Sequence, residues 1–395
     1  MKSFTAAAFC MVLLLVQAPA FAQQSTTPPS GSQQPGAQQQ PDQDQTAPEA
    51  GGPTGDNGSI AIPKKKEKEE PAPPAPAEPT VKNPPGLQNF SLHVDVPIVT
   101  VDVGVLLEKT HQFVPNLKED NFRVYEDGKP QQITSFRQIK APITAVLLVE
   151  FASTSYYFVY DMRNAAFNFA EQLRPDDYIA VATYDMHTNI LTDFTQDKRV
   201  VMNALNTLTI PTWSETNIFD ALYQTLDRLT RVEGRKYIVL IGSGRDTFSK
   251  ITLDKILAKI KATPNVTIFT ISTGGYVRAM TEGRGGLGAQ MRQMDYLQAD
   301  NQMTTFARMT GGMHFEPRFQ GELPEDFAAI NESIRNQYVL TYTPTNTKLD
   351  GTYRKLHVDL VDDEGHALRM QDEKHKPLKY DIIARDGYKA KQQAE

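Results

Sequence analysis

Between residues 141 and 336, unbroken apolar runs alternate with segments in which apolar residues recur every three or four positions. The runs at 143–149, 178–184, 237–241 and 266–271 have the length and composition of strands buried on both faces. The segments between them have the spacing of amphipathic helices. This alternation predicts an α/β domain with a doubly wound, mostly parallel sheet. Its helices are marked by Met162, Ala166, Phe169, Ile218, Leu222, Leu226, Leu253, Ile256 and Ile260.

The flanking segments, residues 87–140 and 337–395, show the period-two pattern of strands instead. In the first of them, Asn121–Tyr125 and Gln132–Phe136 are predicted to pair across a turn at Asp127–Gly128. Neither end alone supplies enough strands for a stable sandwich. We therefore expect both ends to form one β-sandwich into which the α/β domain is inserted, with two small separate β-units as the alternative.

Residues 1–22 have the pattern of a secretory signal peptide. Lys2 gives a positive start, an apolar run follows over residues 6–16, and Ala20-Phe21-Ala22 fits a small-x-small cleavage site. The run is too short to span a bilayer, which takes about 20 residues. We expect an exported product, periplasmic or secreted, without a transmembrane helix.

Residues 23–86 are rich in Gln, Pro, Gly, Ser, Thr and Ala, and contain very few large apolar residues. Such a segment buries too little surface to offset its ordering entropy, which predicts a disordered linker. The single cysteine, Cys10, lies in the signal region, so we expect neither disulfides nor thiolate metal sites. The net charge of −6 at pH 7 disfavours a nucleic-acid partner.

Several stretches are similar to one known family: residues 117–128 (Leu-Lys-Glu-Asp-Asn-Phe-Arg-Val-Tyr-Glu-Asp-Gly), Thr310-Gly311-Gly312, residues 337–344 and Asp386-Gly387-Tyr388. In these stretches, and in its order of strands and helices, the segment from about 90 to 390 resembles bacterial exported proteins known as VWFA-related. Their central domain is a von Willebrand factor A (VWA) domain. The resemblance implies ligand binding that depends on a divalent metal ion.

In that family the metal pattern starts with Asp-x-Ser-x-Ser after the first strand, which offers the hard oxygen ligands that Mg²⁺ prefers. Here Glu150 stands at the first position, and Ala152 and Thr154 fall on the two serine positions. Ala152 has no atom that could ligate a metal. A one-residue slip would bring Ser153 and Ser155 into the serine positions, at the cost of a bulged loop.

The remaining positions of the metal pattern are partly kept. Thr216 matches the family's threonine, Ser243 stands where an aspartate is expected, and Asp246 lies three residues further on. We expect the fold to be retained and the site to be degenerate, with no Mg²⁺ bound. Glu150 would then be solvated at the sheet edge or paired with Arg245.

Aromatic residues gather in the loops expected at the same edge of the sheet. Tyr156 and Tyr157 follow the first strand, and Trp213, the only tryptophan, precedes Thr216. Tyrosine and tryptophan are frequent anchors of protein interfaces, although some of these rings would also suit packing beneath the loop. The sequence predicts that these four residues bind a protein partner in the envelope or extracellular space.

No pattern of catalytic residues is present. The seven histidines are scattered, and neither a Gly-x-Ser-x-Gly elbow nor a phosphate loop occurs. We therefore expect a binding module that is not an enzyme and needs no cofactor. Mg²⁺-dependent adhesion-type binding and a structural role in envelope assembly are the alternatives. The glycine-rich segment 274–300 is predicted to be a mobile loop.

Overall fold

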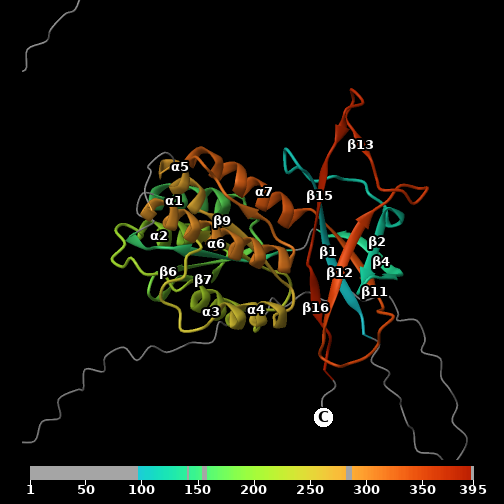
Figure 1. Ribbon diagram of the computed structural model, residues 1–395, viewed down its shortest axis with the longest axis horizontal. Coiled ribbons are helices and arrows are strands. Elements are labelled where there is room, and N and C mark those ends of the chain that lie inside the picture. The colour runs from blue at the N-terminus through green and yellow to red at the C-terminus, as the bar shows by residue number, and fades with distance from the viewer. Residues whose placement is uncertain (1–96, 140–141, 154–157, 282–286, 393–395) are drawn as a thin grey trace, which may run out of the picture. The chain divides into compact units, whose positions relative to one another are not determined.

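The computed structural model describes residues 97–139, 142–153, 158–281 and 287–392. Within these ranges the chain forms an α/β domain, two four-stranded antiparallel sheets and a small two-stranded one (Figure 1). The expected signal peptide and linker lie outside the described residues. No helix that the structure describes combines the length and the hydrophobicity needed to cross a membrane.

The central sheet is doubly wound and mostly parallel, which confirms the predicted fold class. Its strands are β5 (Thr144–Glu150), β6 (Tyr178–Tyr184), β7 (Thr188–Thr195), β8 (Lys236–Gly242), β9 (Val266–Ser272) and β10 (His314–Phe315). They lie in the order β10-β9-β8-β5-β6-β7, and only β6 and β7 are antiparallel neighbours. Leu147 and Leu148 of β5 point into different cores. That two-sided burial is why the strand is an unbroken apolar run.

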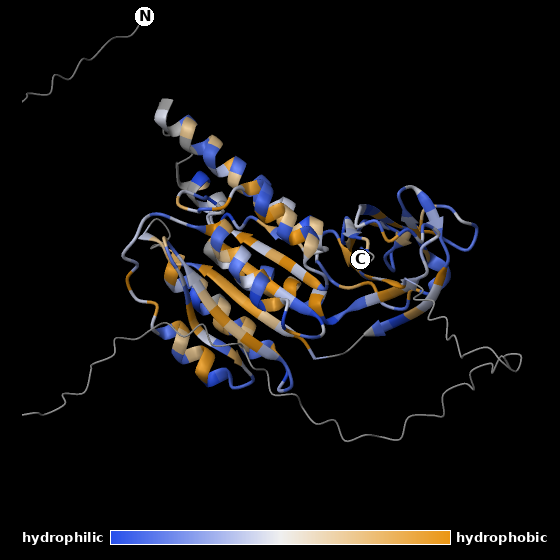
Figure 2. Ribbon diagram, turned by 90° about the horizontal axis from the view of Figure 1, so that it is seen from below, coloured by the Kyte–Doolittle hydropathy of each residue, from blue (hydrophilic) through white to orange (hydrophobic). Residues whose placement is uncertain are grey.

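Helices cover both faces of this sheet. They are α1 (Val159–Gln172), α2 (Lys198–Asn206), α3 (Ile218–Leu229), α4 (Leu253–Ala262), α5 (Gly274–Thr281), α6 (Leu287–Thr310) and α7 (Leu323–Arg335), with short 3₁₀ turns at Glu119–Asn121 and Gln320–Glu322. Residues of α1, α2 and α7 share one core, and residues of α3, α4 and α6 share the other. Hydrophobic residues are concentrated in the strands and on the helix faces turned toward them (Figure 2).

The prediction of a mobile loop over residues 274–300 is wrong. Helices α5 and α6 occupy most of this segment, and only residues 282–286 lie outside the described ranges. Of the glycines in this segment, Gly274 and Gly275 begin α5, and the others lie between positions 283 and 288. Beyond them, α6 is rich in Ala, Gln, Met and Leu, which favour a helix. Ala299 and Met303 are buried and fix α6 on the sheet.

Two antiparallel four-stranded sheets combine strands from both flanking segments. The strands are β1 (Val99–Leu107), β2 (Phe122–Glu126), β3 (Lys129–Gln131), β4 (Ile133–Ile139), β11 (Gln337–Tyr342), β12 (Tyr353–Leu360), β15 (Tyr380–Ala384) and β16 (Gly387–Lys389), with a separate small hairpin of β13 (Met370–Gln371) and β14 (Pro377–Leu378). One sheet has the order β15-β1-β11-β4 and the other β16-β12-β2-β3. Val101, Phe122, Leu340 and Val358 belong to one core between them. The sheets therefore form a β-sandwich.

The predicted pairing of Asn121–Tyr125 with Gln132–Phe136 is wrong. The turn at Asp127–Gly128, with a positive φ at both residues, leads β2 into β3. The chain then crosses to the other sheet, where β4 pairs with β11. The side chain of Gln131 holds the crossing point by bonding both the backbone N–H and the hydroxyl of Thr345.

Helix α7 begins beside a carboxyl group that prefers to stay protonated. Burial and the nearby Glu322 and Glu325 raise the pKa of Asp326 to about 7, and its Oδ2 is buried without a hydrogen-bond partner among the described residues. A pKa that is higher in the folded than in the unfolded state contributes stability at low pH. That contribution is complete below about pH 4 and is lost as the pH rises through about 7.

We expect Asp326→Asn to raise the free energy of unfolding at pH 8 by about 1–2 kcal/mol, a figure reduced for the partial exposure of the group. At pH 4 the same change should have little effect. Urea denaturation at the two pH values measures the difference. Asp254→Asn, in the first turn of α4 and exposed, is the control and should gain nothing at either pH. An equal gain for Asp326→Asn at both would contradict the assignment.

Candidate functional site

The carboxyl ends of the central parallel strands meet at one edge of the sheet, where the loops of such domains bind ligands. Glu150 ends β5, Tyr184 ends β6 and Gly242 ends β8. Strand β5 lies between the other two, and Glu150 is in register with Tyr184. The first position of the predicted metal pattern is therefore in the middle of this carboxyl edge.

Glu150 is completely buried, so the first of the two environments expected for it, solvation at the sheet edge, is wrong. Its Oε2 accepts the backbone N–H of Ser243 at 2.6 Å and the Ser243 hydroxyl at 2.8 Å. A buried carboxylate is costly unless hydrogen bonds replace its water. Ser243 supplies two such bonds from the position where the family pattern has an acid. The longer acid at 150 and the shorter alcohol at 243 thus form a complementary pair.

Tyr184 and Gly242 close the space around the Glu150 carboxylate. A Cβ at Gly242 would overlap the Tyr184 hydroxyl and lie 2.6 Å from Glu150 Oε2, so only glycine fits there. Burial, with the negative charges of Glu150 and Asp246, raises the pKa of Tyr184 well above its usual value. The phenol therefore stays protonated beside the acid. Sequence reasoning missed Tyr184, although it ends a strand that points to the same edge.

Thr216, in the loop between α2 and α3, connects that loop to the one that follows β8. Its hydroxyl donates to the carbonyl oxygen of Arg245 at 2.5 Å, and its backbone N–H donates to the Thr247 hydroxyl at 2.9 Å. The Thr216 carbonyl accepts the backbone N–H groups of Thr247 and Phe248, each at 2.9 Å. The side chain of Thr216 is buried. In this arrangement it braces the loops.

The described residues do not fit the octahedral oxygen set that the resemblance implies. Ala152 is buried and offers no oxygen from its side chain. The carboxylate of Glu150 is held by Ser243, and the hydroxyl of Thr216 is directed to a carbonyl. Ser153 is exposed, and Ser155 lies outside the described residues. The described side chains around Glu150 therefore assemble no ligand set for a cation at this position.

Large apolar side chains are exposed in the loops of the carboxyl edge. Trp213 is 43% exposed, Phe248 48% and Ile210 72%. We call these three residues the edge surface. The carbonyl of Trp213 accepts the backbone N–H of Ser153 at 2.6 Å, and its ring lies edge-on to the ring of His187. The predicted binding residues Tyr156 and Tyr157 lie outside the described residues.

A second polar cluster at this edge was missed by sequence reasoning. Asp300 of α6 is buried and accepts hydrogen bonds from Ser272, at the end of β9, and from Arg278. Arg278 also pairs with Glu316 at 2.7 Å, and His314 lies beside both carboxylates. The ligand atoms of the two acids and the histidine lie within 4.8 Å of one another. Arg278 bridges the two carboxylates and offsets one of their two negative charges within the chain.

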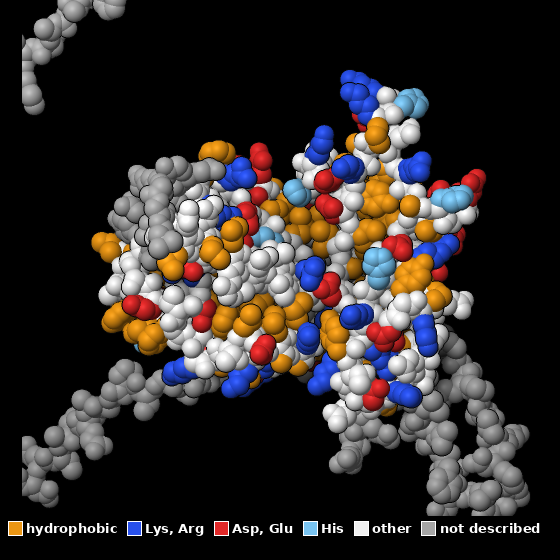
Figure 3. Space-filling view, in the orientation of Figure 1, with side chains coloured by type: hydrophobic (Ala, Val, Ile, Leu, Met, Phe, Trp, Pro, Cys, Tyr) orange, Lys and Arg blue, Asp and Glu red, His pale blue; other side chains and the backbone are white. Residues whose placement is uncertain are grey.

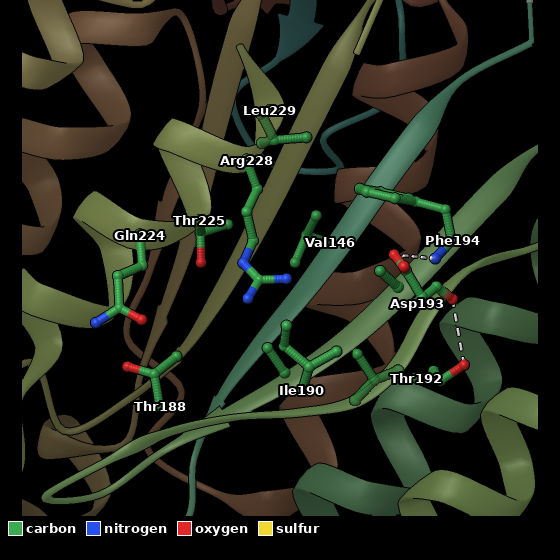
Figure 4. A pocket seen from close by; sticks show the side chains of 13 residues that line it. Val146, Thr188, Ile190, Thr192, Asp193, Phe194, Gln224, Thr225, Arg228 and Leu229 are labelled. Carbon is green, nitrogen blue, oxygen red and sulfur yellow. Dashed lines mark hydrogen bonds between the residues drawn. The ribbon is translucent and has the colours of Figure 1, made fainter. Parts of the chain in front are cut away.

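Figure 4 shows a pocket away from this edge, between β7 and α3. Ile190, Thr225 and Leu229 line it, and the side chain of Arg228 lies across it. Its volume of about 40 Å³ accommodates water only. Sites for organic ligands are roughly ten times larger, so this pocket is not the functional site.

Residues 152–310 match the family model of the von Willebrand factor type A domain. Among solved structures, the chain is similar to a von Willebrand factor type A protein from Catenulispora acidiphila (11% identity, 71% of this chain and 76% of that chain, TM-score 0.39). It is also similar to the conserved hypothetical protein BatB from Bacteroides thetaiotaomicron (10% identity, 49% and 98%, TM-score 0.36). A third is the vWF domain of the type V pili tip protein Mfa5 from Porphyromonas gingivalis (13% identity, 50% and 96%, TM-score 0.36). No curated protein is similar enough in sequence to count as a relative.

Proposed function

The chain contains a von Willebrand factor type A domain, and we propose that this domain binds a protein ligand through the edge surface, without a metal ion and without catalysis. The observation that carries the proposal is the pairing of Glu150 with Ser243. A cation at this position would have to displace two hydrogen bonds from a fully buried carboxylate. Glu150 therefore stands where the family's metal pattern begins, but its carboxylate is hydrogen-bonded by Ser243 of the same chain.

The edge surface has the chemistry of a protein interface. Tryptophan and other aromatic residues supply much of the binding free energy at interfaces when they become buried. Trp213 and Phe248 are each about half exposed, so contact with a partner would remove substantial apolar area from water. Backbone hydrogen bonds from Ser153 to Trp213 and from Phe248 to Thr216 brace both loops. Braced loops lose less conformational entropy on binding.

We expect Trp213→Ala to weaken binding of the partner by about 2 kcal/mol, or roughly 30-fold. Ile190→Ala is the matched control. Ile190 is also 43% exposed, but it lies on β7, lines the pocket of Figure 4 and is not part of the edge surface. The purified chain is used to capture a protein from envelope extract, and mass spectrometry identifies that protein. Calorimetry with the purified partner then compares wild type and both variants.

The same measurement is made with EDTA and with added Mg²⁺. Equal affinities in both support metal-independent binding. Loss of affinity in EDTA would instead establish Mg²⁺-dependent adhesion-type binding. If Trp213→Ala and Ile190→Ala bound the partner with equal affinity, the edge surface would not be the binding site. If the chain captures no discrete partner and fractionates with insoluble envelope material, a structural role in envelope assembly replaces the proposal.

We also propose that the mature protein is exported to the periplasm or beyond. The support is the sequence pattern of residues 1–22, with its positive start, apolar run and cleavage site. Cell fractionation and N-terminal sequencing test this directly. Mature protein in the periplasmic or extracellular fraction, starting at Gln23, is the expected result, and full-length protein retained in the cytoplasm would contradict it.

A further inference from the structure

A large cavity lies at the opposite side of the α/β domain from the edge surface. Lys261, at the end of α4, and Asn265, just before β9, line one wall. The start of β1, the loop before β12 and strand β16 line the other. The cavity therefore opens at the amino ends of the central strands, where α4 packs against β16. Its volume of about 630 Å³ is that of a site for a small organic molecule.

The lining of this cavity is strongly basic. Its charged members are Lys261, Lys348, Arg354, Arg385, Lys389 and Lys391, and no Asp or Glu is among the described residues that line it. The chain as a whole has a net charge of −6, so this composition is a local concentration of positive charge. Lys and Arg side chains gather around the place where α4 meets β16 (Figure 3). We call this cavity the basic pocket.

Not every cation in the basic pocket is available to a ligand. Arg354 is buried and pairs with Glu126 at 3.2 Å, and its guanidinium also donates to the backbone carbonyls of Asn346 and Lys348. The ammonium group of Lys261 lies 5.0 Å from the ring centre of Tyr353, which holds it at the rim. Lys348 and Lys389 are exposed at the rim.

Arg385 provides an independent observation. Its Nε is buried and has no hydrogen-bond partner among the described residues. Burial lowers the pKa of Arg385, and the nearby Tyr353 and Asp102 offset only part of that effect. Asp102 is itself paired with Arg235 at 2.6 Å. A largely desolvated guanidinium is costly, and an anion against the part of the Arg385 side chain that lines the pocket would offset that cost.

We propose that the basic pocket binds a small molecule that carries two or more phosphate or carboxylate groups. One anionic group bonds to the Arg385 guanidinium, whose planar array of donors matches the oxygens of phosphate or carboxylate. Further anionic groups pair with Lys261 and Lys389 at the rim, where ammonium groups act as mobile point charges. This site is separate from the edge surface, so it does not depend on the proposed function.

Calorimetry of the purified chain with pyrophosphate and with citrate tests the proposal. We expect saturable binding of at least one anion, weakening as the salt concentration rises, and the preferred anion identifies the chemical group. Lys389→Glu should weaken binding at least about ten-fold, because it reverses a charge at the rim. Lys255→Glu, an exposed residue of α4 that does not line the pocket, is the matched control and should change the Kd less than about two-fold.

A third variant separates the buried contact from the charge of the rim. Arg385→Gln should also weaken binding, provided that circular dichroism shows the variant to be folded. If it is not folded, Lys261→Glu provides a second test of the charge at the rim, and it should weaken binding as Lys389→Glu does. Absence of heat with both anions, or an equal loss in Lys255→Glu, would overturn the proposal. The proposal would also be overturned if the chain sedimented with phosphatidylglycerol vesicles but bound neither pyrophosphate nor citrate.

Discussion

Replacing Gly242 with alanine is expected to lower the free energy of unfolding by about 2–4 kcal/mol. The new methyl group would overlap the Tyr184 hydroxyl and press on Glu150, which Ser243 holds by two hydrogen bonds. Because Tyr184 and Glu150 are both fully buried at the carboxyl edge, neither neighbour can move readily into solvent. Urea denaturation followed by the fluorescence of Trp213, the only tryptophan, measures the loss.

Gly288→Ala is the matched control for this substitution. Gly288 lies near the start of α6, and an added Cβ there meets nothing within 4 Å. Alanine favours a helix over glycine, so this variant should be unchanged or slightly more stable. The double variant Gly242→Ala/Tyr184→Phe should recover part of the lost stability, because it removes the atom that the methyl group meets first. A wild-type stability for Gly242→Ala would show that the carboxyl edge is not packed as described.

Replacing Glu126 with alanine is expected to cost about 3–5 kcal/mol of stability. Glu126 is buried in the sandwich and accepts hydrogen bonds from Tyr342 at 2.7 Å, Tyr388 at 2.8 Å and Arg354 at 3.2 Å. Burial and the bond to Glu126 raise the pKa of Tyr388 to about 12, so its phenol remains a donor at neutral pH. Removing the carboxylate leaves a buried guanidinium without its counter-charge.

Glu126→Gln should fall between Glu126→Ala and wild type, because the amide keeps the shape and one acceptor but loses the charge. Glu119→Ala, an exposed acid just before β2, should stay within about 0.5 kcal/mol of wild type. Thermal and urea denaturation measure all three. If Glu126→Ala were as stable as Glu119→Ala, the four strands β2, β11, β12 and β16 would not depend on this contact.

The two proposed binding regions use different physical principles at opposite edges of one sheet. The edge surface offers apolar side chains on braced loops, above an acid that Ser243 already satisfies. The basic pocket offers cations, one of which has a buried donor without a partner. Salt should therefore affect the two kinds of binding differently: it weakens ion pairing and leaves apolar burial largely intact. A protein ligand and a small anion could then occupy the chain independently.

Much of the α/β domain could be predicted from local pattern. Unbroken apolar runs predicted strands β5, β8 and β9, and apolar residues at helical spacing predicted helices α1, α3 and α4. The helix over most of residues 274–300 was missed, because its glycines suggested a loop although the residues after them favour a helix. The crossing of β4 to the second sheet was missed as well, since pairing partners far apart in sequence leave no local pattern.

Local sequence pattern specifies which types of element follow one another and which strand-ending residues lie at the carboxyl edge. Glu150 and Ser243 were placed there because they follow predicted parallel strands, whose ends must share an edge. Thr216 was placed there by its resemblance to the family's threonine. The contacts that these groups make depend on the packing of the folded chain. The distances that bury Glu150 against Ser243, and that bring Lys261 and Arg385 to one cavity, depend on packing between segments that are distant along the chain. Such contacts are fixed by the whole core and not by local pattern.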